Sequence, residues 1–118
     1  MANGVNLPAQ LQEQLQRLQQ LQQTLQVIVS QRQQLEIESS EIDRALGELE
    51  KMPDDGVVYK SIGSLLMKSE KKKLIEELRE RKELTTMRVS VLAKQQSRTE
   101  ERLKELQQII QERIKPST

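Results

Sequence analysis

The chain has 118 residues, of which 35% are hydrophobic and 31% are charged, and Tyr59 is its only aromatic residue. Large aromatic side chains supply much of the burial in a globular core, so this composition argues against an ordinary globular domain. Leucine and glutamine dominate, with 17 of each. That mixture is typical of helices packed along a narrow seam.

Histidine and cysteine are both absent. Their absence excludes zinc fingers, thiol nucleophiles, disulfide frameworks and His-based acid/base catalysis, so we expect no enzymatic activity, no metal and no cofactor. The formal charge is only +1, which gives no net attraction to nucleic acid or to an anionic membrane. No apolar run exceeds three residues, so we expect neither a signal peptide nor a transmembrane span, and we expect a cytoplasmic protein.

After an N-terminal tail at 1–6, residues 7–52 are expected to form the first long helix, because Pro8 is tolerated in a first turn and no other proline follows until Pro53. With Leu11 at heptad position a, nine of the 12 a and d positions up to Leu49 are apolar. Such a regular spacing predicts a coiled-coil helix.

Residues 53–69 break the helical period. Pro53 and the Asp-Asp-Gly sequence after it form a turn, and segments 57–61 and 64–68 read as two short β-strands joined at Gly63. Because an isolated hairpin is marginally stable and has two open edges, we expect it to pair with strands of other chains. The expected oligomerisation residues are Val57, Val58, Tyr59, Ile62, Gly63, Leu65, Leu66 and Met67.

A second coiled-coil helix is expected at 70–115, followed by a C-terminal tail at 116–118. Ser69 can cap its N-terminus. With Ile75 at position a, seven of the 12 seam positions are apolar. Glu77 and Arg81 are expected to form an ion pair on the exposed face.

The two heptad frames predict an intramolecular antiparallel coiled coil in which a meets d. Leu18 then faces Leu106, whereas Ser39 faces Thr85, so the polar mid-arm is expected to pack loosely. Other expected pairs are Leu21 with Leu103, Leu35 with Val89, Ile42 with Lys82, Leu46 with Leu78, and Leu49 with Ile75.

Near the two chain ends, the aliphatic residues exceed what the seam needs. On periodicity alone, these residues either widen the apolar stripe by which the helices of an ordinary bundle pack or form a binding surface. The two interpretations are equally favoured. The candidate binding residues are Val5, Leu7, Leu11, Leu15, Ile109, Ile110 and Ile114.

Other features have simpler interpretations. The glutamines between Gln10 and Gln34 fill outer helix positions, so a solvated face is favoured over a prion-like segment. The lysines at 71–73 lack interleaved aromatic residues and have glutamates beside them, which argues against a nucleic-acid site. There is no Gly-rich phosphate loop, so we expect no ATP hydrolysis.

The stretch from Leu49 through Pro53-Asp54-Asp55 and on to Lys68 carries a family resemblance. Its core is Val58-Tyr59-Lys60-Ser61-Ile62-Gly63-Ser64-Leu65-Leu66-Met67-Lys68, leading into Glu76-Glu77-Leu78. This sequence between two heptad helices resembles prefoldin, and the single hairpin is similar to that of the archaeal β-type subunit.

The resemblance implies a hexamer of two α-type and four β-type chains, in which the hairpins form a shared β-barrel body and coiled-coil arms extend from it. It also implies capture of unfolded polypeptides at the arm tips without ATP and their delivery to a group II chaperonin. The tip candidates above follow from arm geometry and not from a matched motif. The alternative is a structural adaptor that oligomerises through the hairpin and binds one defined partner.

Overall fold

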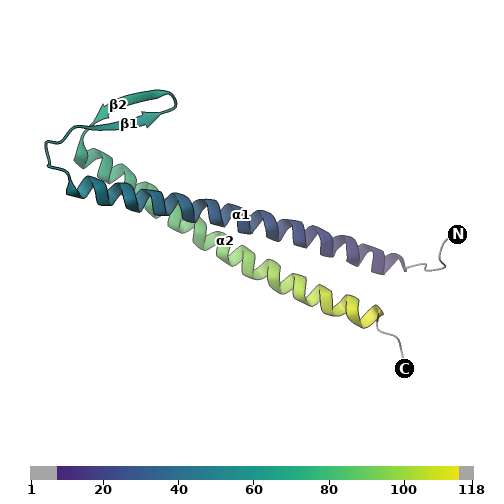
Figure 1. Cartoon of the computed structure of the whole chain (residues 1–118). Helices are drawn as coiled ribbons and strands as arrows, with labels where there is room; N and C mark the ends of the chain where they lie inside the picture. Colours follow the sequence, from purple (N-terminus) through teal and green to yellow (C-terminus); the bar gives the residue numbers. More distant parts are fainter. Residues whose placement is uncertain (1–7, 115–118) are drawn as a thin grey trace. The chain divides into compact units, whose positions relative to one another are not determined.

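A computed structural model describes residues 8–114. In chain order it contains α1 (Ala9–Lys51), β1 (Val58–Ile62), β2 (Leu65–Ser69) and α2 (Lys71–Ile114) (Figure 1). The prediction of two long helices with an antiparallel β-hairpin between them is confirmed. The chain divides into two compact units, and each is described by itself below. Unit 1 comprises residues 1–31 and 92–118, and unit 2 comprises residues 32–91.

In unit 1, the beginning of α1 and the end of α2 pack against each other in antiparallel orientation (Figure 1). Leu11 is buried together with Leu106 and Ile110. At the same end, the Arg113 guanidinium donates a 3.0 Å hydrogen bond to Oε1 of Gln10. Three more leucines pack against the buried cluster, and they are Leu15, Leu18 and Leu21.

In unit 2, the end of α1 and the beginning of α2 are joined by charged side chains along the seam. Arg81 contacts Glu38 through a 2.8 Å ion pair, and Lys82 bonds to the Asp43 carboxylate. Lys82 was expected to face Ile42, but its amino group reaches Asp43, the next residue along α1. Because the long lysine stem lets the charge reach solvent, Ile42 itself stays buried.

The expectation of a loosely packed mid-arm is wrong at Thr85, in unit 2. Thr85 is only 3% exposed. Its hydroxyl donates a 2.8 Å hydrogen bond to the carbonyl of Arg81, one turn earlier in the same helix. A hydroxyl satisfied in this way can be buried without water or a cross-helix partner, so a polar residue at the seam does not open it.

The heptad frames account for burial throughout the described helices. Every helical residue that is buried occupies an a or d position of the predicted frames, including the two threonines. These residues are Leu11, Ile28, Ile42, Leu49, Thr85, Thr99, Leu106 and Ile110.

The hairpin turns through two residues, Gly63 and Ser64. Gly63 has φ +58°, a conformation that costs glycine little and that a type II′ turn requires at its first central position. The strand ladder runs from the pair Ile62 with Leu65 to the pair Val58 with Ser69. The prediction that Ser69 caps the second helix is therefore wrong: Ser69 belongs to β2, and the Glu70 carbonyl accepts the first backbone hydrogen bond of α2, from Leu74.

Candidate functional site

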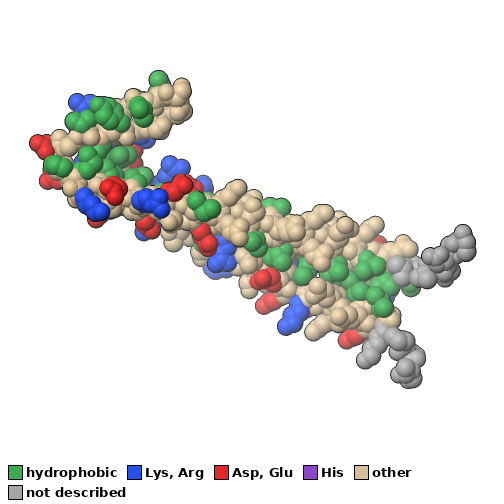
Figure 2. Space-filling view, viewed as in Figure 1, with side chains coloured by type: hydrophobic (Ala, Val, Ile, Leu, Met, Phe, Trp, Pro, Cys, Tyr) green, Lys and Arg blue, Asp and Glu red, His purple; other side chains and the backbone are tan. Residues whose placement is uncertain are grey.

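The β-hairpin of unit 2 is the first candidate site, because it carries apolar side chains on both faces. Residues paired across an antiparallel ladder share a face. Ile62, Leu65 and Met67 therefore lie on the face that includes Val58, whereas Tyr59 and Leu66 lie on the other. Figure 2 shows hydrophobic side chains gathered over this hairpin.

Most of these hairpin side chains are open to solvent. Only Val58 is buried, and Leu66 is 74% exposed. A two-stranded sheet has two open edges and cannot cover either face by itself. Exposed apolar faces beside unpaired strand edges are typical of a surface that pairs with strands of other chains. The other predicted apolar residues of the hairpin segment are between 49% and 64% exposed, and they are Val57, Tyr59, Ile62, Leu65 and Met67.

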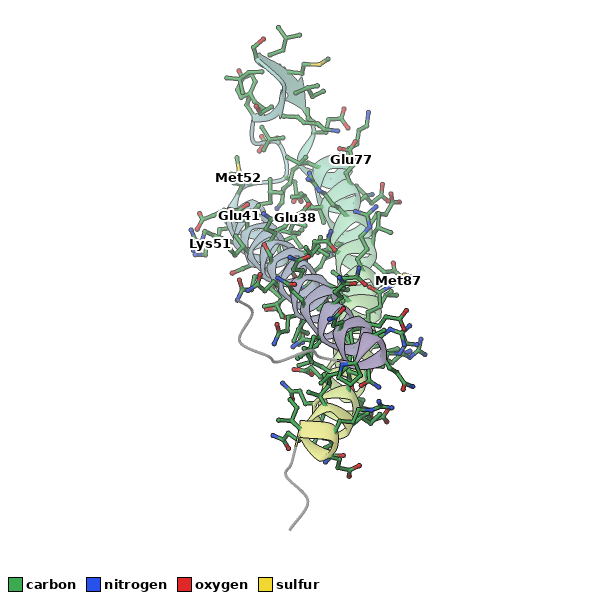
Figure 3. The ribbon with its side chains drawn as sticks, turned by 90° about the vertical axis from the view of Figure 1, so that its right-hand side faces the viewer. Glu38, Glu41, Lys51, Met52, Glu77 and Met87 are labelled. Carbon is green, nitrogen blue, oxygen red and sulfur yellow. The ribbon has the colours of Figure 1, made fainter. Side chains whose placement is uncertain are left out.

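One ion pair fixes the hairpin to α2. The Lys60 ammonium on β1 donates a 2.7 Å hydrogen bond to the carboxylate of Glu77, which is labelled on α2 in Figure 3. This hydrogen bond lowers the pKa of Glu77 from its ordinary value of 4.5, with smaller electrostatic contributions from Lys60 and Lys73 that partial desolvation opposes. The expected ion pair of Glu77 with Arg81 is wrong, since Arg81 bonds to α1 instead.

Lys71, the first residue of α2, ties the segments that flank the hairpin together. Its ammonium donates a 2.6 Å hydrogen bond to the carbonyl of Met52 and a 3.2 Å bond to the Asp54 carboxylate. The Lys71 side chain is largely buried. A cation is favourable beside the carbonyl groups at the end of a helix, so Lys71 stabilises the C-terminus of α1.

The aliphatic residues near the helix ends of unit 1 are the second candidate site, and the structure divides them into two groups. Leu11 and Ile110 are buried in the seam, so they support the surface instead of forming it. Ile109 is exposed and Ile114 is 58% exposed. Leu15 packs against the buried cluster, and two other candidates, Val5 and Leu7, lie outside the described residues.

Beside the seam of unit 1 lies an open groove of about 500 Å³. Its apolar lining comes from Leu21, Leu106 and Ile109, and its lining also includes Arg17 and Arg102. A groove that combines apolar and charged side chains can accept an aliphatic side chain of a partner while the partner's backbone stays hydrated. The remaining lining residues are Gln20, Thr24 and Glu105.

Ile109 is the only lining residue of this groove among the binding residues predicted from the sequence. The missed signal was present in the heptad frames: Arg17 and Thr24 occupy position g of α1, and Arg102 and Ile109 occupy position g of α2. In an antiparallel pair, the g positions of both helices border the same side of the seam. Leu15 and Ile114 occupy position e and so border the opposite side.

Neither site contains the side chains of a metal centre. Among residues 8–114, no group of three or more acidic, histidine or cysteine side chains is placed to hold a metal ion. Within the same part of the chain, neither helix is apolar enough over a sufficient length to span a membrane.

The sequence profile described as "Prefoldin subunit" matches residues 12–117. The chain belongs to the prefoldin subunit family. The prefoldin subunit beta of Thermococcus kodakarensis is 42% identical to it over 113 residues, which cover 96% of this chain and 97% of that protein.

Two further prefoldin relatives agree with this assignment. The prefoldin subunit beta of Thermoplasma volcanium is 48% identical over 109 residues, covering 92% of this chain and 88% of its own. The crystal structure of the prefoldin beta subunit from Thermococcus strain KS-1 superposes with a TM-score of 0.83 at 41% identity, covering 95% of this chain and 98% of that one. The resemblance to a β-type prefoldin subunit is thus confirmed. The chain is a prefoldin chaperone subunit, in a family of chaperones and not of enzymes.

Proposed function

We propose that this chain is a subunit of an ATP-independent holdase, which captures unfolded polypeptides in the cytoplasm and delivers them to a group II chaperonin. The observation that carries the capture function is the groove of unit 1, whose lining includes the exposed Ile109. On the opposite side of the seam, Ile114 is also exposed. Unfolded chains display the aliphatic side chains that such a surface accepts.

The hairpin supports the assembly part of the proposal. Its exposed apolar faces and open edges fit a shared β-barrel body formed by several hairpins. We propose a hetero-hexamer of two α-type and four β-type prefoldin subunits, with this chain as a β-type subunit. Membership of the prefoldin family supports assembly with other subunits.

The small size of the apolar surface at the helix ends of unit 1 suits reversible capture. One groove with a few aliphatic side chains binds an unfolded segment weakly, so each contact forms and breaks quickly. Several arms acting on the same polypeptide raise the effective concentration of the remaining sites, which multiplies the overall affinity without any strong single contact. Weak individual contacts also permit transfer of the client to a chaperonin.

The direct test is suppression of aggregation of several unrelated denatured proteins by the assembled complex without nucleotide. In the double variant Ile109→Ser and Ile114→Ser, we expect suppression to fall strongly while the mass of the complex is unchanged. Ile37→Ser is the control, because Ile37 is 60% exposed on α1 but belongs to neither candidate site.

Unchanged suppression by the double variant would contradict the assignment of capture to the helix ends. Failure to protect any of the unrelated proteins, with tight binding of one partner, would instead identify the chain as a structural adaptor.

A further inference from the structure

Glutamine side chains form a strip along α1 within unit 1, beside the groove that includes Ile109. Two further hollows of about 400 and 460 Å³ adjoin that groove. Both share Gln20 with it, and in addition one shares Arg17 and the other shares Thr24. The three hollows therefore form one continuous channel along α1.

All of the α1 residues that line this channel lie on one side of the helix. In the predicted heptad frame they occupy only positions c, d, f and g, which are neighbours around the helix axis. We call this set the glutamine strip, because five of its 11 members are glutamines. Its members are Gln10, Glu13, Gln14, Gln16, Arg17, Gln20, Leu21, Gln23, Thr24, Val27 and Ile28.

The glutamine strip carries almost no charge. Glu13 and Arg17 are its only charged members, whereas residues 92–114 of α2 contain nine charged side chains. A ligand that complements the strip in charge is therefore neutral. Three exposed glutamines of the strip make no hydrogen bond within residues 8–114, and they are Gln16, Gln20 and Gln23.

A polypeptide backbone is a neutral ligand of matching chemistry. A glutamine amide accepts hydrogen bonds through its carbonyl oxygen and donates them through its NH₂ group, and each peptide unit presents the same two kinds of group. In an extended segment of an unfolded chain, these backbone groups are not bonded to each other. A row of glutamine amides can therefore bond to them whatever the side chains of that segment are.

We propose that the glutamine strip binds the main chain of an extended client segment while the apolar groove takes the segment's aliphatic side chains. This inference rests on the proposed capture function and adds the part of the site that makes capture independent of client sequence. From Gln10 to Ile28 the strip is roughly 27 Å long, at about 1.5 Å per helical residue. It accommodates about eight residues of an extended chain, which rises about 3.3 Å per residue.

Each of these hydrogen bonds replaces one with water, so its net contribution to binding is small. A row of several bonds is needed for a measurable effect, which agrees with weak and reversible contacts at each arm. The informative test is therefore to remove several glutamine amides together.

The strip variant combines Gln16→Met, Gln20→Met and Gln23→Met in the assembled complex. Methionine is unbranched, similar in length to glutamine and a good helix former, so the helix is kept while the amides are lost. The mass of the complex checks that assembly is unchanged.

The matched control combines Gln19→Met, Gln22→Met and Gln26→Met. These glutamines are also exposed on the same stretch of α1, but they line none of the three hollows. Because both variants add the same number of methionines, a general effect of added apolar surface is the same in the two.

The probes are two labelled peptides of about eight residues, the length that the strip accommodates, with identical aliphatic side chains. One peptide has ordinary amide bonds. In the other, alternate amide bonds are replaced by esters, which removes backbone N–H donors. Fluorescence anisotropy gives the dissociation constant of each peptide with the wild-type complex and with both variants.

We expect the strip variant to bind the amide peptide about fivefold or more weakly than the wild type and the control, because several hydrogen bonds are lost together. The wild type should bind the ester peptide with a similar loss of affinity. The strip variant should lose little further affinity for the ester peptide, since both changes remove the same bonds.

Two results would overturn backbone recognition and leave capture by the apolar groove standing. One is binding of the amide peptide by the strip variant as tightly as by the control, and the other is an equal loss of affinity for both peptides. Absence of binding of either peptide by the wild-type complex would overturn the proposed capture at the helix ends, and the inference would fall with it.

Discussion

The hairpin of unit 2 and the helix ends of unit 1 both contain many apolar residues, but they use them in opposite ways. The hairpin buries only Val58 and exposes most of the others. The helix ends bury Leu11, Leu106 and Ile110 together and leave a smaller apolar surface that includes Ile109 and Ile114. The difference arises because two helices can cover each other's apolar stripes, whereas a two-stranded sheet cannot cover its own faces, and this one is covered only at Val58.

This difference matches two kinds of binding. A broad apolar surface with unpaired strand edges favours a permanent interface, since hydrophobic burial and backbone hydrogen bonds form together. A small surface beside a closed seam favours contacts that dissociate readily. In the proposed function, the hairpin is therefore the assembly surface and the helix ends of unit 1 are the capture surface.

The largest effect is expected from Leu66→Lys in the hairpin. Leu66 is 74% exposed in the single chain, so the subunit should fold normally. In the proposed barrel the lysine would be buried without a partner, at a cost of about 3 kcal/mol or more per site. Light scattering should therefore show loss of the complex. Ile37→Lys should assemble normally, and assembly of Leu66→Lys at wild-type concentrations would contradict the role of this face.

A smaller effect is expected from Leu106→Ala in the seam of unit 1. Leu106 is buried against Leu11 and Ile110, so its truncation should lower the free energy of unfolding by about 2 to 3 kcal/mol. Faster amide hydrogen exchange at the helix ends should report the loss, with the complex intact. The neighbouring Ile109→Ala should cost less than about 1 kcal/mol, because Ile109 is already exposed. Similar costs at both positions would show that the helix ends do not separate core from surface.

The smallest effect concerns the ion pair that fixes the hairpin to α2. Because the pKa of Glu77 is lowered in the folded chain, its stabilising contribution is complete above the unfolded pKa near 4.5 and is lost as pH falls through the lower, folded value. In Lys60→Met, an NMR titration should show the pKa of Glu77 rising toward 4.5. An unchanged pKa would mean that Lys60 does not hold the carboxylate.

The helical seam was predictable residue by residue, because the heptad spacing records which positions face the partner helix. Leu18, Leu106 and Ile110 lie in or against the predicted interface. The local interactions at its borders were less predictable. Ser69 was assigned as a cap and Glu77 as a partner of Arg81, but the strand ladder and the docked hairpin take these residues instead. Long-range pairing outweighs local propensity where both compete for the same group.

By itself, the sequence determined the helix–hairpin–helix order, the seam positions, the turn at Gly63 and, through the motif around Tyr59, membership of the prefoldin family. Only the tertiary structure decided which apolar residues remain exposed. It buried Thr85 at a position expected to be loose, divided the helix-end candidates into core and surface, and left Leu84, Met87 and Val91 uncovered. The physical reason is that periodicity specifies the direction of a side chain relative to its own helix, whereas exposure depends on what the neighbouring elements cover.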